Sequence, residues 1–246
     1  MKSAKYRDLK FGVTRVKVRR EASGIQYIEA EQELGKYPER MTDRLIHWAT
    51  VKPNETLFAR RVKNADGTSG DWQRVTYSQA LTYGKHIAQG LINRGLSQER
   101  PVLILSENDI EHALMGLGCM IAGVPYCPAS PAYSTISQDY EKLRHILNTL
   151  TPGLVFAADS HRYAKAIQTA VDSNVEVILN HGTVESHKNS SFSDLLATPI
   201  TSKVDAAIHA TTPDTIVKFL FTSGSTKLPK AVINTQRMWC ATTCIN

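Results

Sequence analysis

The feature that most constrains this chain is a regular alternation of short apolar strands with helices from Thr56 onward. Short, continuously apolar runs predict buried strands at residues 101–105, 124–127, 154–157, 175–179 and 215–221. Apolar residues at helical spacing predict helices over residues 76–95, 108–123, 137–150 and 162–171. Strands joined by single helices need crossover connections, so we expect an α/β fold with a mostly parallel sheet and helices on both faces.

Local signals place the ends of two of these helices. Thr76 and Gln79 have the spacing of a capping box, and Asn108 is expected to cap the next helix with Glu111 in its first turn. Gly95 is placed to end the first of these helices and Gly123 the second. The buried faces are expected to hold Ala80, Ile87, Ala88 and Leu91 in the first helix, and Ile110, Ala113, Leu114, Leu117 and Ile121 in the second.

Three segments lie outside this array. Residues 56–62 and 72–75 predict a hairpin around an Asp-Gly turn, and residues 181–214 are polar and predict a surface connection. At the N-terminus, alternating valines and a turn at residues 22–24 predict a β-hairpin, which we expect to pack on its own domain. We therefore divide the chain into a basic hairpin arm, residues 1–38, and a domain over residues 39–246.

The formal net charge of +6 is concentrated in residues 1–20, and the rest of the chain is close to neutral. A basic arm of this kind could contact RNA or an acidic membrane surface. The strand-like alternation favours a hairpin instead, so we expect no nucleic-acid partner. No apolar run reaches the roughly 18 to 20 residues of a membrane span, and the first residues lack the apolar core of a secretory signal.

Cysteine and histidine usage gives no sign of a disulfide framework or a metal site. Cys119, Cys127, Cys240 and Cys244 are too few for a disulfide scaffold in a chain of 246 residues, and we expect them reduced in the cytoplasm. The eight histidines are scattered, and no pair has the spacing of a zinc site on a helix. The acidic residues Glu107, Asp109 and Glu111 lie at a helix start, where carboxylates are expected to be structural.

The segment with the clearest chemistry is the loop after the last predicted strand, Thr-Ser-Gly-Ser-Thr-Lys-Leu-Pro-Lys at residues 222–230. A polyphosphate needs hydrogen-bond donors at short range and a counter-charge. The loop offers both, with hydroxyls at Thr222, Ser223, Ser225 and Thr226, a close backbone approach at Gly224, and positive charge at Lys230. It is not a Walker loop, because no second glycine precedes either lysine. An exposed Ser/Thr/Gly connector is the alternative for such a composition.

Residues 221–230 resemble the phosphate-binding signature of the adenylate-forming acyl-activating enzymes. Residues 231–238, 42–45 with Trp48, and 122–126 are similar to feruloyl-CoA synthetases. The resemblance implies ATP, Mg²⁺ and coenzyme A as cofactors and a hydroxycinnamate-like carboxylic acid as substrate. It implies that a carboxylate first reacts with ATP to give an acyl-adenylate and that the CoA thiol then displaces AMP. It also implies that Thr222, Ser223, Ser225 and Thr226 bind the β- and γ-phosphates, that Gly224 allows their approach, and that Lys230 neutralises them.

The sequence departs from the family pattern in three places. Lys227 stands where glycine is usual, and Gln236 stands where feruloyl-CoA synthetases commonly carry histidine. The chain also ends at Asn246, well before the later family motifs, so we expect the N-terminal part of a large domain, inactive alone, with no nominated catalytic residue and a possible complementary C-terminal chain. Two other functions stay open: a nucleotide-binding or split-subunit module without catalysis, and a surface or nucleic-acid binder that uses the basic arm.

Overall fold

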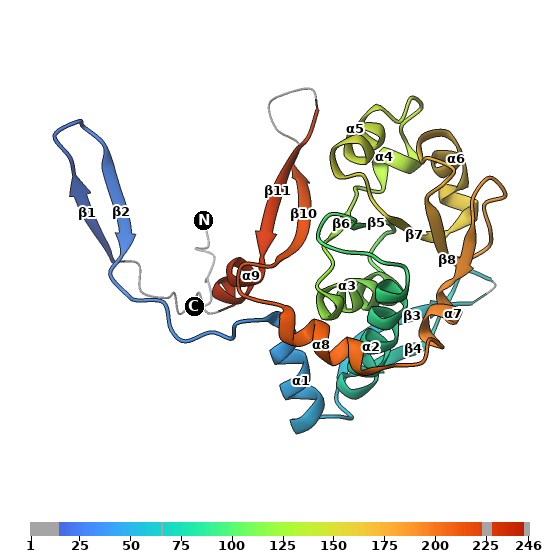
Figure 1. Cartoon of the computed structure of the whole chain (residues 1–246), viewed down its shortest axis with the longest axis horizontal. Helices are drawn as coiled ribbons and strands as arrows, with labels where there is room; N and C mark the ends of the chain where they lie inside the picture. Colours follow the sequence, from blue (N-terminus) through green and yellow to red (C-terminus); the bar gives the residue numbers. More distant parts are fainter. Residues whose placement is uncertain (1–14, 65, 223–227, 244–246) are drawn as a thin grey trace, which may run out of the picture.

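The computed structural model describes residues 15–64, 66–222 and 228–243. Within them a central sheet has the strand order β11-β10-β6-β5-β7-β8-β9, shown in Figure 1. Its strands are β5 (Val102–Leu105), β6 (Tyr126–Pro128), β7 (Leu154–Asp159), β8 (Glu176–His181), β9 (Asn189–Ser191), β10 (Ile216–Thr222) and β11 (Lys230–Thr235). Every pairing from β10 to β9 is parallel, and β11 is antiparallel to β10. The predicted α/β fold with a mostly parallel sheet is confirmed.

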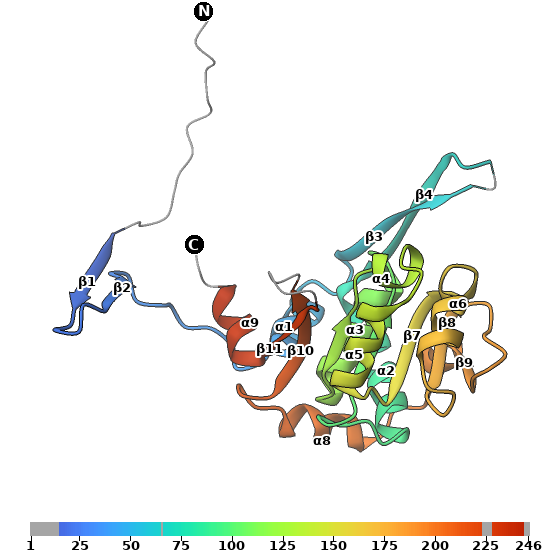
Figure 2. The ribbon, with the colours of Figure 1, turned by 90° about the horizontal axis from the view of Figure 1, so that it is seen from above.

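Helices cover both faces of this sheet. Successive side chains of a strand point to opposite faces, so the apolar strands give each face a core that helices cover. Val102 and Ile104 of β5 pack into one core with α2 (Tyr77–Asn93) and α3 (Ile110–Ala122). Leu103 and Leu105 pack into a second core on the opposite face. That second core contains α5 (Glu141–Leu150) and α6 (Ser160–Ala170), and the short α4 (Ala132–Thr135) lies beside α6. These layers are visible in Figures 1 and 2.

The predicted helix ends are confirmed at three positions and wrong at one. Thr76 and Gln79 form the capping box of α2, Gly95 follows that helix with φ +66°, and Gly123 ends α3 with φ +67°. The N-cap of α3 is Asp109 and not Asn108, since the carboxylate of Asp109 accepts the Ile110 amide hydrogen at 2.8 Å. Both residue types cap helices well, so the extended backbone of Asp109 decides the position.

The predicted surface connection over residues 181–214 is also wrong. It contains β9, α7 (Phe192–Leu196) and α8 (Ser202–Ala210). Each of these short helices buries two apolar side chains: Phe192 and Leu195 in α7, Val204 and Ile208 in α8. The segment reads as polar because these elements are short and bury only one narrow face each.

Two hairpins stand beside the central sheet. The predicted hairpin of β3 (Thr56–Lys63) and β4 (Ser69–Thr76) is confirmed and follows α1 (Met41–Val51). The N-terminal hairpin is confirmed as β1 (Val16–Arg20) and β2 (Gln26–Ala30), paired in antiparallel register. Its expected packing on the domain is wrong, because every residue of both strands is exposed and the hairpin lies apart from the sheet in Figures 1 and 2.

Candidate functional site: the β10–β11 loop

The two ends of the predicted phosphate loop are held together by a strand pair. Thr222, the last residue of β10, is the antiparallel partner of Lys230, the first residue of β11. One step further from the loop, Phe221 is paired with Ala231. The predicted site residues Ser223, Gly224, Ser225 and Thr226 lie outside the described residues, as does Lys227. The structure therefore fixes Thr222 and Lys230 of the predicted set.

This loop leaves the sheet at the edge where ligands bind in α/β folds. Strand β10 is parallel to β6, with Lys218 opposite Tyr126. Thr222 thus emerges at the same edge as the carboxyl ends of β6, β5 and β7. Open α/β sheets bind ligands outside the carboxyl ends of their strands.

Lys230 is available as a counter-charge at this edge. Its side chain and that of Thr222 are exposed, and Lys230 takes part in none of the ion pairs found between described residues. Lys218, the lysine of β10, lies about 13 Å back along the strand from Thr222 at roughly 3.3 Å per residue. Its ammonium nitrogen sits 3.7 Å from the centre of the Trp239 ring, and burial lowers its pKa. Lys218 therefore serves the packing of the sheet, whereas Lys230 is an exposed cation at one end of the loop.

The two stems of the loop are Phe221–Thr222 at the end of β10 and Pro229–Lys230 at the start of β11, and both contact α5. The Nε2 atom of His145 lies 2.9 Å from the carbonyl oxygen of Pro229, which is buried. The His145 ring also meets the Phe221 ring edge to face, with 6.1 Å between ring centres. The sequence offered no signal for His145, because 84 positions separate it from Pro229.

The same edge carries a hollow of about 480 Å³, lined by the ends of β5, β7 and β8 and by β3. Four of its charged groups form two ion pairs across the lining, Arg60 with Asp109 and Arg162 with Glu107. Arg60 binds Asp109 and Glu111, the latter at 2.9 Å, and Arg162 binds Glu107 at 2.7 Å. A hydrogen bond from Arg162 lowers the pKa of Glu107. The expected place at the helix start is confirmed for Asp109, the N-cap of α3, and for Glu111 in its first turn.

Gln236, one of the departures from the family pattern, has a structural role in the described chain. It begins α9 (Gln236–Thr242), is 1% exposed, and accepts the backbone hydrogen of Met41 at 3.0 Å through its side-chain oxygen. Met41 is the first residue of α1, whose first amides have no partner inside the helix. Gln236 therefore ties the strand pair that carries the loop to the start of the domain.

The described residues hold no group of three or more His, Cys, Asp or Glu side chains that could bind a metal ion. Cys119, Cys127 and Cys240 are buried, and burial raises the pKa of Cys127 to about 12. Tyr133, on the short helix after β6, packs against the second core. Of the helices in the described ranges, none combines the length and apolar character that crossing a bilayer requires.

Curated relatives of this chain include acyl-CoA ligases and nonribosomal peptide synthetases. It is 25% identical to fatty acyl-CoA synthetase B of Dictyostelium discoideum over 82% of its own length and 31% of the relative. It is 26% identical to the phenylacetyl-CoA ligase epaB of Aspergillus niger, over 64% of this chain and 30% of the relative. It is 25% identical to 4-coumarate-CoA ligase 1 of Narcissus pseudonarcissus, over 65% of this chain and 28% of the relative. The chain thus spans about a third of the length of these relatives.

Solved structures with the same fold are adenylate-forming enzymes. The carboxylic acid reductase didomain of Segniliparus rugosus, in complex with AMP, matches with a TM-score of 0.62 and 14% identity, over 80% of this chain and 32% of that one. The fatty acyl-adenylate ligase of L. pneumophila matches with a TM-score of 0.57 and 20% identity, over 80% of this chain and 30% of that one. The family model described as AMP-binding enzyme matches residues 45–245. The chain belongs to the AMP-binding enzyme family.

Proposed function

We propose that this chain supplies the triphosphate-binding loop of an ATP-dependent acid–CoA ligase. The observation that carries the proposal is the pairing of Thr222 with Lys230 at the carboxyl edge of the sheet. This pairing brings an exposed hydroxyl and an exposed ammonium group to the two ends of a loop that resembles a phosphate-binding signature. The family match over residues 45–245 and the acyl-CoA ligase relatives support the same reading.

The residues of the loop would divide the work by their chemistry. Thr222, Ser223, Ser225 and Thr226 would donate hydrogen bonds to the β- and γ-phosphates of ATP, and Gly224 would allow their close approach. Lys230 would offset the charge of the pyrophosphate as it leaves. ATP with Mg²⁺ supplies the activated phosphorus that a carboxylate attacks. Mg²⁺ would be held in part through oxygens of the phosphates, as it usually is at nucleotide sites.

For the acid, we propose a hydroxycinnamate-type carboxylate, with coenzyme A as the thiol that forms the thioester. The support is the similarity of residues 42–45, 122–126 and 231–238 to feruloyl-CoA synthetases. Among the relatives, 4-coumarate-CoA ligase 1 and the phenylacetyl-CoA ligase are named for aromatic acids. The division of the chain at residue 38, and a complementary C-terminal chain as partner, stay predictions.

Two assays separate binding from turnover. Calorimetric titration of the chain with Mg-ATP should show weak, saturable binding that Lys230→Ala abolishes. We expect no ATP–pyrophosphate exchange from the chain alone with ferulate, because it spans about a third of the relatives' length. Equal heats for the chain and its Lys230→Ala variant would refute the loop as the nucleotide contact, and robust exchange would refute the expected inactivity.

A further inference from the structure

His145 bridges the two stems of the candidate loop. Its ring packs edge to face against Phe221, which directly precedes Thr222, with an interplanar angle of 87°. Its Nε2 atom lies 2.9 Å from the carbonyl oxygen of Pro229, which directly precedes Lys230. One side chain thus contacts the chain both where it enters the loop and where it leaves.

The chemistry of the hydrogen bond fixes its direction. A carbonyl oxygen can only accept, so the Nε2 atom of His145 carries a hydrogen and donates it. Pro229 has no amide hydrogen, and its neighbour Lys230 is the first residue after the loop that pairs with β10. The bond from His145 therefore holds the peptide unit that joins Pro229 to Lys230, just beyond the end of the strand ladder.

Helix α5 gives this contact a rigid support. Its buried side chains belong to the second core, which also contains Cys127 and Ala129 at the end of β6. Phe219 and Phe221 of β10 pack against the same core. The residues of α5 that enter it are Leu143, Ile146, Leu147 and Leu150. A side chain on an element packed this way can hold a neighbouring loop in a defined position.

We infer that His145 is a positioning residue for the phosphate loop: it sets the geometry of the two stems so that Thr222 and Lys230 point to a common ligand. This inference rests on the proposed function of the loop. It assigns no contact between His145 and the nucleotide. The role is carried by two separable parts of the side chain, the ring against Phe221 and the N–H toward Pro229.

A matched pair of variants separates these parts. His145→Phe keeps an aromatic ring beside Phe221 and removes the donor. His145→Gln removes the ring and keeps an N–H at nearly the same reach as Nε2. His209→Phe, at an exposed position of α8, controls for a histidine-to-phenylalanine change away from the loop.

Two readouts are needed: amide hydrogen exchange over residues 221–231, and the dissociation constant for Mg-ATP from calorimetry. We expect His145→Phe to exchange about fivefold to tenfold faster in this segment, and to bind Mg-ATP more weakly by a similar factor, the net worth of about one hydrogen bond. We expect His145→Gln to recover most of the slow amide exchange and most of the Mg-ATP affinity. The thermal midpoint of all three variants should stay within about 3 °C of that of the unmodified chain. If His145→Phe does not fold, His145→Asn takes its place as the variant without a donor, because the shorter asparagine side chain does not reach the Pro229 carbonyl.

The outcomes distinguish this inference from the proposed function. If the unmodified chain binds Mg-ATP and His145→Phe binds it equally well, the positioning role is wrong and the loop assignment stands. If His145→Gln is as weak as His145→Phe, the donor is not what positions the stem, and the inference fails. If the unmodified chain shows no Mg-ATP binding, the loop assignment fails and takes the positioning role with it.

Discussion

Thr222 and Lys230 face each other across the β10–β11 pair, so the two ends of the candidate loop are held one strand spacing apart. That spacing is about 5 Å, close enough for a hydroxyl and an ammonium group to bind neighbouring oxygens of one phosphate chain. The stem is not isolated. His145 holds it from α5, and Gln236 holds the far end of β11 to α1.

Gly118 tests the packing of α2 against α3. A Cβ atom at Gly118 would overlap the side chain of Ile87, which is 0% exposed and has little rotamer freedom. Alanine favours a helix over glycine by about 1 kcal/mol, but overpacking a tight core costs about 1–3 kcal/mol and is expected to win. Gly118→Ala should therefore lower the free energy of unfolding, measured by urea denaturation. Gly35→Ala, where the new Cβ meets nothing within 4 Å, should change it by less than about 0.5 kcal/mol. A higher midpoint for Gly118→Ala would contradict the described helix contact.

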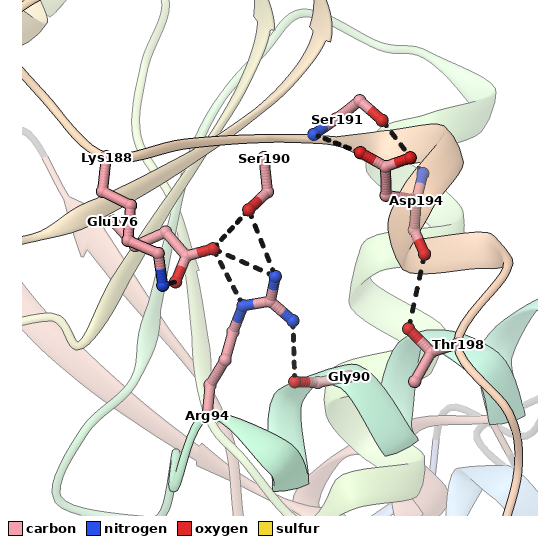
Figure 3. Close-up of polar contacts among 8 residues, drawn as sticks. All are labelled: Gly90, Arg94, Glu176, Lys188, Ser190, Ser191, Asp194 and Thr198. Carbon is pink, nitrogen blue, oxygen red and sulfur yellow. Dashed lines mark hydrogen bonds and ion pairs between the residues drawn. The ribbon is translucent and has the colours of Figure 1, made fainter.

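Glu176 holds β8, β9 and the end of α2 together, as Figure 3 shows. One of its oxygens accepts from Arg94 at 3.0 Å and from Ser190 at 2.6 Å, and the other pairs with Lys188 at 3.0 Å. Glu176→Gln should cost about 1–3 kcal/mol of unfolding free energy, because it leaves the half-buried guanidinium of Arg94 without its counter-charge. Asp205→Asn breaks an exposed pair with Lys85 and should cost less than about 1 kcal/mol. Equal losses in the two variants would refute the network as a stabilising unit.

The same carboxylate predicts a pH dependence. Burial raises the pKa of Glu176, but hydrogen bonds from Ser190, Arg94 and Lys188 outweigh burial and leave it below its usual value. A lowered folded pKa means that the stabilisation is fully present above the unfolded pKa, about 4.3, and is lost as the pH falls through the folded pKa. The stability difference between the unmodified chain and Glu176→Gln should therefore be largest near pH 6 to 7 and shrink below about pH 4. A difference that grows on acidification would contradict the assignment.

Gln236 offers a test of the link between α9 and α1. Gln236→Leu keeps an apolar volume in a buried position but leaves the Met41 amide hydrogen without its acceptor. We expect a loss of about 1–3 kcal/mol in unfolding free energy. Met238→Ala, at an exposed position of the same helix, should be nearly neutral. If Gln236→Leu is neutral as well, the hydrogen bond to Met41 does not stabilise the chain.

Much of the fold could be predicted from local signals. The capping box at Thr76 and the glycine at position 123 act over a few residues, and the alternation of apolar strands and helices is enough to specify a parallel sheet. The choice between Asn108 and Asp109 as N-cap could not be predicted, because it depends on where the chain leaves β5.

What the sequence could not reveal depends on tertiary contact. The short helices α7 and α8 exist because a few apolar residues find a buried site, not because their segment is periodic. The exposed N-terminal hairpin shows the reverse, since its alternation predicts strands correctly and says nothing about what they pack on. The contact of His145 with Pro229 joins residues 84 positions apart and has no local signature.

The most direct test of the central claim is a calorimetric titration of the chain with Mg-ATP, beside Lys230→Ala and a control, Lys203→Ala on α8. We expect saturable binding for the unmodified chain and for Lys203→Ala. We expect a loss of at least about tenfold in affinity for Lys230→Ala, the scale of a charge-assisted contact. The same affinity for all three proteins would contradict it.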